Sequence, residues 1–309
     1  MSLLSVVIPV YNAENTLWEL FKRLQKSLES ITSDYEIILV DDGSKDKSWE
    51  IIKIIAKSDH RLRATQLVRN FGQHVAITAG LHKCNGDHVV VMDCDLQDSP
   101  EEIARLYAKA GEGYHVVVAR RNQRKDGRFK IFCSIAFYKV LSYLSGRQFD
   151  PQVGCFRIIS RQVVDNYRLM QDKIRFFISM VEWMGFSTAS VDILHAPRYE
   201  GKSNYTLRKL FSLAMDIIIA NSYKPLKVSI LFGISVAILS FIVALYLFVR
   251  AYFYGVLISG WSSIMISLFF IGGVMIFNLG LLGIYISKIF DQVKNRPLYI
   301  QLDEIGFAS

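Results

Sequence analysis

Apolar and amphipathic segments alternate along the first part of the chain. LSVVIPVYN (4–12) and YEIILVDDGS (35–44) are nearly continuous apolar runs rich in β-branched residues, which is typical of strands buried on both faces. ATQLV (64–68), HVVVMD (88–93) and YHVVVARR (114–121) predict three further strands. Segments with apolar residues at helical spacing separate these strands. The alternation predicts an α/β fold with a doubly wound, mainly parallel sheet and right-handed crossovers.

Two long apolar segments near the C-terminus predict membrane-spanning helices, at about 228–250 and 261–287. Apart from Arg250, which lies between them, residues 228–287 carry no charged side chain. At 1.5 Å per residue, about 22 residues form a helix of about 33 Å, enough to cross a hydrocarbon core of ~30 Å. The alternative is a pair of buried core helices. The mean hydropathy of +0.26 is high for a soluble protein and favours the membrane interpretation.

Charges beside the two spans predict their orientation. Basic residues lie just outside the spans on one side, and the short connection carries only Arg250 at its edge. The positive-inside rule therefore places both termini in the cytoplasm. No targeting signal is expected, because MSLLSVVIPV lacks a basic region and runs directly into a strand pattern. The flanking basic residues are Lys224, Lys227, Lys288, Lys294 and Arg296.

These patterns divide the chain into four parts. Residues 1–205 form a cytoplasmic domain, in which 129–146 is expected to be a helix at the membrane interface. Residues 206–225 form a second interfacial amphipathic helix, 226–290 the two spans, and 291–309 a cytoplasmic tail. For both interfacial segments, ordinary packing onto the sheet is the alternative.

Polar residues follow each of the five predicted strands at the point where the strand ends. Parallel sheets of this kind bind ligands beyond the carboxyl ends of their strands. A single cluster of this type is usually a polar loop cap, but five clusters on one edge predict a binding site. The clusters are Pro9, Tyr11 and Asn12; Asp41, Asp42, Gly43 and Ser44; Arg69, Asn70 and Gly72; Asp93 and Asp95; and Arg120 with Arg121.

Asp93 and Asp95, separated by one residue after a buried strand, predict a divalent cation. Like charges this close raise one another's pKa unless a cation lies between them. Mg²⁺ or Mn²⁺ bound through oxygens satisfies both carboxylates and commonly shares its coordination shell with substrate phosphates. The formal net charge of +8, carried mostly by the soluble part, fits phosphorylated substrates and anionic membrane lipids. Nucleic acid is not expected as a partner, because no aromatic-interleaved basic motif is present.

Six motifs in order, followed by two spans, resemble the polyprenyl-phosphate glycosyltransferases across essentially the whole chain. These are membrane-attached, inverting family-2 enzymes with a Rossmann-like GT-A fold, the group that contains dolichol-phosphate mannose synthase and the bactoprenol glucosyltransferases. The motifs are VVIPVYN, ILVDDGSKDKS, LVRNFGQHVAITAG, GDHVVVMDCDLQDSPE, VGCFRIISR and YEGKSNYTLRKL.

The resemblance implies transfer of a sugar from a nucleotide sugar, expected to be UDP-linked, to undecaprenyl or dolichyl phosphate. The reaction would take place with inversion at the cytoplasmic membrane face, with the bacterial inner membrane as the expected location. Its product would be a lipid-linked monosaccharide for assembly or modification of lipopolysaccharide or cell-wall glycans. The resemblance also implies a homo-oligomer, with a tetramer as one candidate.

The resemblance also assigns roles to individual residues. Asp93, Asp95, Gln97 and Arg128 would be catalytic, and Asp93 with Asp95 would hold the metal. The nucleotide would be bound by Pro9, Tyr11, Asp41, Asp42, Arg69 and Asn70. Phosphates of the donor or the lipid would be contacted by Arg120, Arg128, Arg198, Lys202 and Ser203, among which the arginines offer bidentate guanidinium groups.

Three positions depart from the family pattern. The family often has Tyr-Asn-Glu after the first strand, whereas Ala13 stands here and Glu14 comes one place late. Cys94 separates the two acids of the metal motif and is interpreted as a small side chain rather than a ligand. Cys155 stands where many relatives have an aspartate, sometimes proposed as a catalytic base.

Two other functions remain open at this point. A processive polysaccharide synthase is disfavoured, because SMVEWMG lacks the usual Gln-x-x-Arg-Trp motif and two helices form no channel. A membrane-anchored nucleotide-sugar binding protein without transfer activity is the other alternative. Asp93 and Asp95 speak against it and Cys155 speaks for it.

Overall fold

The computed structural model describes residues 3–121, 153–173, 175–193, 224–254 and 260–307. These residues belong to two compact units. One comprises the described residues up to 193 together with 296–307, and the other comprises 224–254 and 260–295. Arg128, Arg198, Lys202 and Ser203 lie outside the described residues, as do the interfacial helix at 129–146 and residues 206–223 of the second one.

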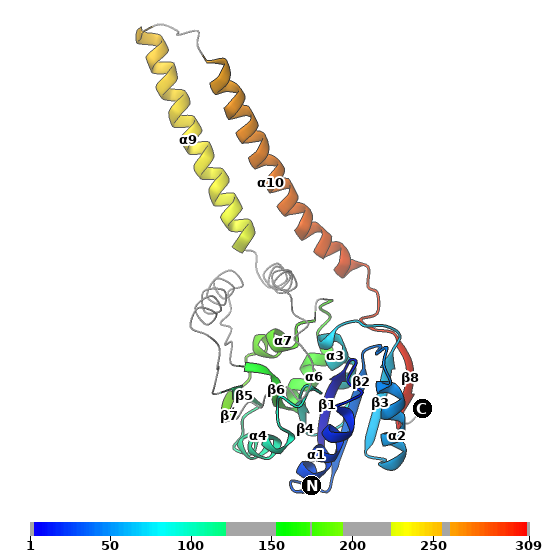
Figure 1. Cartoon of the computed structure of the whole chain (residues 1–309). Helices are drawn as coiled ribbons and strands as arrows, with labels where there is room; N and C mark the ends of the chain where they lie inside the picture. Colours follow the sequence, from blue (N-terminus) through cyan, green and yellow to red (C-terminus); the bar gives the residue numbers. More distant parts are fainter. Residues whose placement is uncertain (1–2, 122–152, 174, 194–223, 255–259, 308–309) are drawn as a thin grey trace. The chain divides into compact units, whose positions relative to one another are not determined.

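The first unit is built on an eight-stranded sheet in the order β7-β5-β6-β4-β1-β2-β3-β8 (Figure 1). All five predicted strands are present and run parallel to one another. They are β1 (Leu4–Val10), β2 (Tyr35–Asp41), β3 (Leu62–Leu67), β4 (His88–Val91) and β5 (Val116–Arg121). The mainly parallel, doubly wound sheet is thus confirmed.

Three strands were not predicted from the sequence. β6 (Val153–Ser160) enters between β4 and β5 and runs antiparallel to both, while β7 (Thr188–Ile193) pairs parallel with β5. β8 (Gln301–Ile305) pairs antiparallel with β3 at the far edge. Residues 301–305, expected to be part of a tail, are therefore a strand of the sheet.

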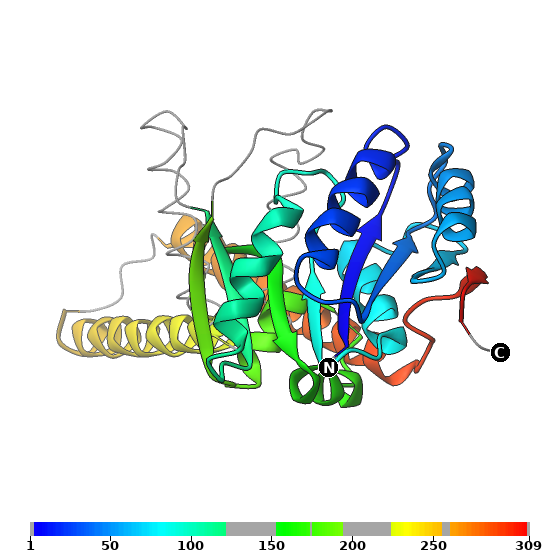
Figure 2. The ribbon, with the colours of Figure 1, turned by 90° about the horizontal axis from the view of Figure 1, so that it is seen from below.

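Two layers of helices cover the sheet on opposite faces (Figure 2). One layer buries apolar side chains of β1, β2 and β4 beneath α1 (Leu17–Glu29), α2 (Ser48–Ser58) and α4 (Ile103–Ala110), the last preceded by the 3₁₀ turn η1 (Pro100–Glu102). The other layer consists of α3 (Gln73–Lys83), α6 (Arg161–Leu169) and α7 (Phe177–Trp183). Because both faces are covered, β1, β2 and β4 are nearly continuous apolar runs.

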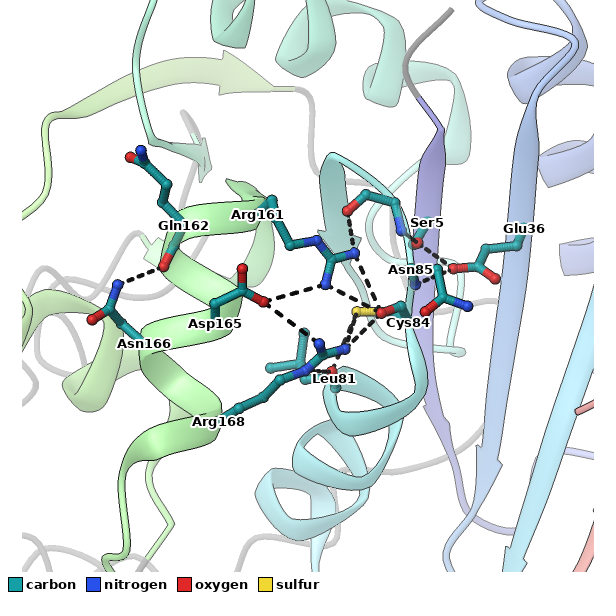
Figure 3. Close-up of polar contacts among 11 residues, drawn as sticks. Ser5, Glu36, Leu81, Cys84, Asn85, Arg161, Gln162, Asp165, Asn166 and Arg168 are labelled. Atoms are coloured by element: carbon teal, nitrogen blue, oxygen red, sulfur yellow. Dashed lines mark hydrogen bonds and ion pairs between the residues drawn. The ribbon is translucent and has the colours of Figure 1, made fainter. Parts of the chain in front are cut away.

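A polar cluster fixes the C-terminal end of α3 (Figure 3). Arg161 donates to the carbonyl oxygens of Cys84 and Gly86, and Arg168 donates to those of Leu81 and Cys84. Guanidinium groups satisfy the unpaired carbonyls at a helix end and complement its dipole. The opposite end of α3, which begins at Gln73, is thereby held beside the carboxyl ends of the strands.

The chain returns to the sheet after the second unit. The Val68 amide donates to the Ile300 carbonyl at 3.0 Å, and the Thr65 hydroxyl donates to the Asp303 carbonyl at 3.4 Å. Lys83 of α3 forms an ion pair with Glu304. These contacts tie the C-terminal segment to β3 and to the helix layer beside it.

The second unit contains α9 (Lys224–Tyr254) and α10 (Trp261–Val293). Both are long and apolar enough to cross a membrane, and the spans expected at 228–250 and 261–287 lie within them. Their large apolar side chains are exposed, as at Leu231 (63%) and Phe277 (67%). Within this unit, Ser229 hydrogen-bonds Asn278 and joins the two helices.

Candidate active site

The loops that follow β1 and β2 are joined side by side at the carboxyl edge of the sheet. Asn12, with a φ of 49°, donates its amide to Ser44 Oγ at 3.0 Å and accepts from the Lys45 amide at 2.9 Å. This brings Tyr11, which is 41% exposed, beside the residues that follow β2. The predicted nucleotide residues at the ends of β1 and β2 are therefore neighbours, and Pro9 lies buried within β1.

Glu14 has a structural role in this pair of loops. Its carboxylate accepts from the Lys47 amide at 3.0 Å, directly before α2, and its own amide donates to Asp46 at 3.1 Å. An anionic side chain at the start of a helix satisfies an unpaired amide and complements the dipole. The preceding Ala13 donates its amide to Ser48 Oγ at 2.9 Å. The late position of this glutamate thus fits the loop.

Asp41 and Asp42 end β2 and are both buried. Asp41 accepts from the Ser44 amide at 3.2 Å and from Gln66 Nε2 at 3.0 Å. Burial raises the pKa of Asp41, and the hydrogen bonds from Ser44 and Gln66 oppose this rise.

The Asp42 side chain binds the loop that precedes α3. Its two oxygens accept from the amides of Phe71 at 2.7 Å and Gly72 at 2.9 Å. Burial raises the pKa of Asp42 to about 6 in spite of these two bonds. The acid therefore titrates close to neutral pH.

Gly43 allows the loops after β2 and β3 to pass in contact. It adopts a φ of +66°, and a Cβ built there would lie 2.5 Å from the Arg69 carbonyl carbon. Only glycine fits both constraints. Arg69 itself stacks on Phe71 with 4.2 Å between guanidinium and ring centroid, and both Arg69 and Asn70 are exposed at this edge. The structure thus brings these two predicted residues next to Asp42.

Asp93 and Asp95 follow β4 and are partly exposed. Asp95 accepts from the Gln97 amide at 3.1 Å across Leu96, whose φ is +59°. Burial, reinforced by the charges of Asp93 and Asp95, raises the pKa of Cys94 to about 12.

The two carboxylates fit a divalent cation by donor type and position. Hard cations of the Mg²⁺ and Mn²⁺ type prefer carboxylate oxygens, and both acids stand at the edge where parallel sheets bind nucleotides. Within the described part of the chain, no group of three or more His, Cys, Asp and Glu side chains gathers as a metal site.

Gln73 joins this acidic pair to β6. Its Nε2 donates to Asp93 Oδ1 at 2.5 Å and lies 3.7 Å from Cys155 Sγ. Since Gln73 directly follows Gly72, one short segment connects Asp42 at the end of β2 with Asp93 at the end of β4. Cys155, which is 8% exposed, is thereby placed at the candidate metal site.

Several residues of this edge were not predicted from the sequence. Gln66, Gln73, Ser44 and Ser48 all contact predicted site residues or their loops. Only Ser44 was named, as part of a strand-end cluster. Gln73 lies one residue beyond the cluster at the end of β3, so a slightly wider reading of that loop would have included it. Arg120 lies exposed at the end of β5, opposite Val153 of β6.

Comparisons with protein families and with curated proteins identify the family and the relatives of this chain. Residues 5–168 match the model of glycosyl transferase family 2. The chain is 38% identical to an uncharacterized glycosyltransferase of Bacillus subtilis, with 99% of this chain and 95% of that protein covered. It is 36% identical to a prophage-derived bactoprenol glucosyl transferase of Shigella flexneri, covering 96% of each. It is 35% identical to the undecaprenyl-phosphate 4-deoxy-4-formamido-L-arabinose transferase of Proteus mirabilis, covering 98% and 94%.

Among solved structures, the chain resembles glucosyl-3-phosphoglycerate synthase from Mycobacterium tuberculosis, crystallised in complex with Mn²⁺, uridine diphosphate and phosphoglyceric acid. The TM-score is 0.51 with 20% identity, and the alignment covers 71% of this chain and 77% of that one. At this identity the likeness shows the fold, and the GT-A expectation is confirmed.

Proposed function

The chain belongs to glycosyl transferase family 2, and we propose that it transfers a sugar from a nucleotide sugar to a polyprenyl phosphate with inversion. The observation that carries this proposal is the full-length similarity to transferases named for bactoprenol and undecaprenyl phosphate. The acidic strand edge and the two apolar helices support it, because the reaction joins a water-soluble donor to a membrane-bound acceptor. The product would be a lipid-linked monosaccharide.

The nucleoside would lie between the loops after β1 and β2. Tyr11 offers an exposed ring on which a base can stack. Asp41 and Asp42 keep free lone pairs after accepting their loop amides, since a carboxylate offers about four acceptor sites. One of them would accept the N–H of the base. Arg69 and Asn70 would border the ribose and phosphates from the next loop, and uracil is the expected base.

Asp93 and Asp95 would hold Mg²⁺ or Mn²⁺ together with the donor's diphosphate. When bound, the ion would supply positive charge to the diphosphate as negative charge grows on it. Gln97, whose backbone amide donates to Asp95, would lie toward the sugar, as the family resemblance implies. Gln73 would keep Asp93 in a fixed orientation.

The reaction would be a direct displacement. An oxygen of the lipid phosphate attacks the anomeric carbon as the bond to the donor's diphosphate oxygen breaks, and the nucleoside diphosphate leaves. The nucleophile needs no base, because the second pKa of a phosphate monoester is near ~6 and the group is largely dianionic at pH 7. Arg120, Arg128, Arg198, Lys202 and Ser203 would contact the phosphates, which suits their residue types.

The protein would sit in the membrane with its sheet-containing unit and both termini in the cytoplasm, and the bacterial inner membrane is the expected location. The basic residues at the N-terminal end of α9 and at the C-terminal end of α10 support this orientation. The short connection between the helices would face the other side. We further propose a homo-oligomer, with a tetramer as one candidate.

Incubation of the purified full chain with labelled nucleotide sugars and undecaprenyl phosphate tests the function. We expect a lipid-linked monosaccharide from one member of a panel of donors, in the presence of Mg²⁺ or Mn²⁺. A growing polymer would instead identify a processive synthase. Donor binding with no transfer across the whole panel would identify a binding protein, and either result would overturn the proposal.

A further inference from the structure

A fully buried arginine lies next to the candidate active site and forms no ion pair with any of the described residues. Arg157 of β6 has no exposed surface. Its Nη2 donates to the Gly154 carbonyl at 2.8 Å, its Nε has no hydrogen-bond partner, and its guanidinium lies 5.4 Å from the centre of the Phe177 ring. Within the described part of the chain, no carboxylate forms an ion pair with it. A buried charge left in this condition is costly unless an anion compensates it.

The neighbours of Arg157 leave its positive charge in place. Burial lowers the pKa of Arg157, while the nearby Cys155 and Glu182 act in the opposite direction. Burial, together with the charge of Arg157, lowers the pKa of His74 to about 4, so this imidazole is neutral at pH 7. The guanidinium is therefore the nearby positive charge, and the Glu182 carboxylate acts on it without forming an ion pair within the described part of the chain.

The sheet register places this charge opposite Val91, at the end of β4 that precedes Asp93. Cys155 and Arg157 are two residues apart on β6, so both side chains leave the same face of the sheet. Both lie beneath the start of α3, where Gln73 contacts Cys155 at 3.7 Å and Asp93 at 2.5 Å. An aspartate at position 155 would place a carboxylate beside this arginine, whereas the thiol does not.

We propose that Arg157, lying behind the thiol of Cys155, forms the subsite that receives the phosphate monoester of the lipid acceptor. The inference rests on the proposed function and names where its nucleophile binds. In a low-dielectric interior a charge acts over several ångströms, so Arg157 attracts the dianion without reaching the surface. It is a positioning residue, because it holds the phosphate at the edge beside Asp93 and takes part in no bond that forms or breaks.

Binding of a short lipid phosphate tests this assignment without turnover. The full chain in detergent is titrated with farnesyl phosphate, with farnesol as the uncharged control and uridine diphosphate as the control for the donor site. We expect Arg157→Met to lower the affinity for farnesyl phosphate at least tenfold and to change the affinity for uridine diphosphate by no more than about twofold. Arg175→Met is the matched control. Arg175 is also buried, at 7% exposed, with two unpartnered nitrogens and an aromatic ring beneath it, but its charge acts on His82 at the other end of α3.

An equal loss of affinity for farnesyl phosphate in both arginine variants would overturn the subsite and leave the proposed function standing. An unchanged affinity in Arg157→Met would do the same. If Arg157→Met lowered the affinity for uridine diphosphate alone, Arg157 would belong to the donor site instead. A wild-type chain that neither binds farnesyl phosphate nor transfers sugar would overturn the proposed function as well.

A second pair of variants keeps Arg157 and does not depend on its replacement folding. Cys155→Asp gives the arginine a counter-ion, whereas Cys155→Asn adds the same bulk without charge. We expect Cys155→Asp to bind farnesyl phosphate at least tenfold more weakly than Cys155→Asn. The Michaelis constant for undecaprenyl phosphate should rise in Cys155→Asp with that for the nucleotide sugar unchanged. Equal acceptor affinity in the two variants would overturn the proposal.

Discussion

Gln73 and Asp93 are joined by a hydrogen bond of 2.5 Å from Nε2 to Oδ1, which connects the start of α3 to the end of β4. Asp42 binds the amides of the two residues directly before Gln73. The part of the edge expected to bind the nucleoside is thus linked to the part expected to bind metal through consecutive backbone and side-chain bonds.

Removal of the Gln73 amide should loosen Asp93. We expect Gln73→Ala to lower kcat about tenfold, equivalent to about 1.4 kcal/mol, and to raise the Mn²⁺ concentration needed for half-maximal activity. Gln73→Glu should lose more, because it places a like charge beside Asp93. Gln25→Ala removes a surface bond between Gln25 and Glu29 of α1 and serves as the control. Wild-type metal dependence in both Gln73 variants would contradict the role of this bond.

Loss of one ligand charge should impair metal-supported turnover. Asp95→Asn keeps the size of the side chain, and we expect turnover to fall by roughly 10²-fold or more. Asp34→Asn, at an exposed position before β2, is the control. Activity is measured over a range of Mg²⁺ and Mn²⁺ and again in excess EDTA. Full activity in EDTA, or wild-type turnover in Asp95→Asn, would show that this pair of acids holds no essential metal.

Cys155 should be dispensable for proton transfer. Because the acceptor phosphate is already largely dianionic at pH 7, we expect Cys155→Ala and Cys155→Ser to retain activity within about tenfold. The maximal rate should stay flat from roughly pH 7 to 9. A hundredfold loss in both variants, with a rate that rises through the range where thiols titrate, would identify Cys155 as catalytic.

Nucleoside affinity should fall in mild acid because of Asp42. Burial raises the pKa of Asp42 to about 6, so the carboxylate that would accept a base N–H is present above this pH and lost below it. We expect affinity for uridine, which has no titrating phosphate, to be constant above about pH 7 and to fall by up to tenfold per unit below 6. Asp42→Asn should bind weakly at all pH values. Saturation-transfer NMR measures the affinity of the wild type and of Asp42→Asn. If the affinity of Asp42→Asn still fell below pH 6 as in the wild type, the titration would belong to another group.

Assembly should depend on the glycines of α10. Small residues let membrane helices approach closely, and a Cβ added at Gly273, Gly280 or Gly283 would meet no atom within 4 Å in a single copy. We therefore expect Gly280→Leu to reduce the mass of the detergent-solubilised particle in light scattering, with Ile276→Leu as the control. An unchanged mass would favour the alternative in which these glycines serve packing against α9 within one chain.

The local pattern of apolar and polar residues was sufficient to predict several strands and both long apolar helices. β1, β2 and β4 are predictable because strands covered on both faces must be apolar throughout, and α9 and α10 because a membrane span requires a long uncharged run. Asp93 and Asp95 stood out because carboxylates directly after such a strand have no role in the core. The rule that ligands bind at the carboxyl ends of parallel strands then gathered the polar residues onto one edge.

Only the tertiary structure decided which partners those residues have. β6 was not predicted, because Arg157 interrupts its otherwise apolar run and is explained only by the helices that cover it. The pairing of β8 with β3 includes a hydrogen bond between residues 238 positions apart, a separation at which sequence periodicity carries no signal. The bonds from Gln73 to Asp93 and from Asp42 to the loop before α3 likewise depend on three strand ends meeting in space. The sequence by itself determined the strands and the chemistry at their ends, whereas the burial of Arg157 behind Cys155 required the packed helices, because desolvation of a charge is a property of its surroundings and not of its neighbours along the chain.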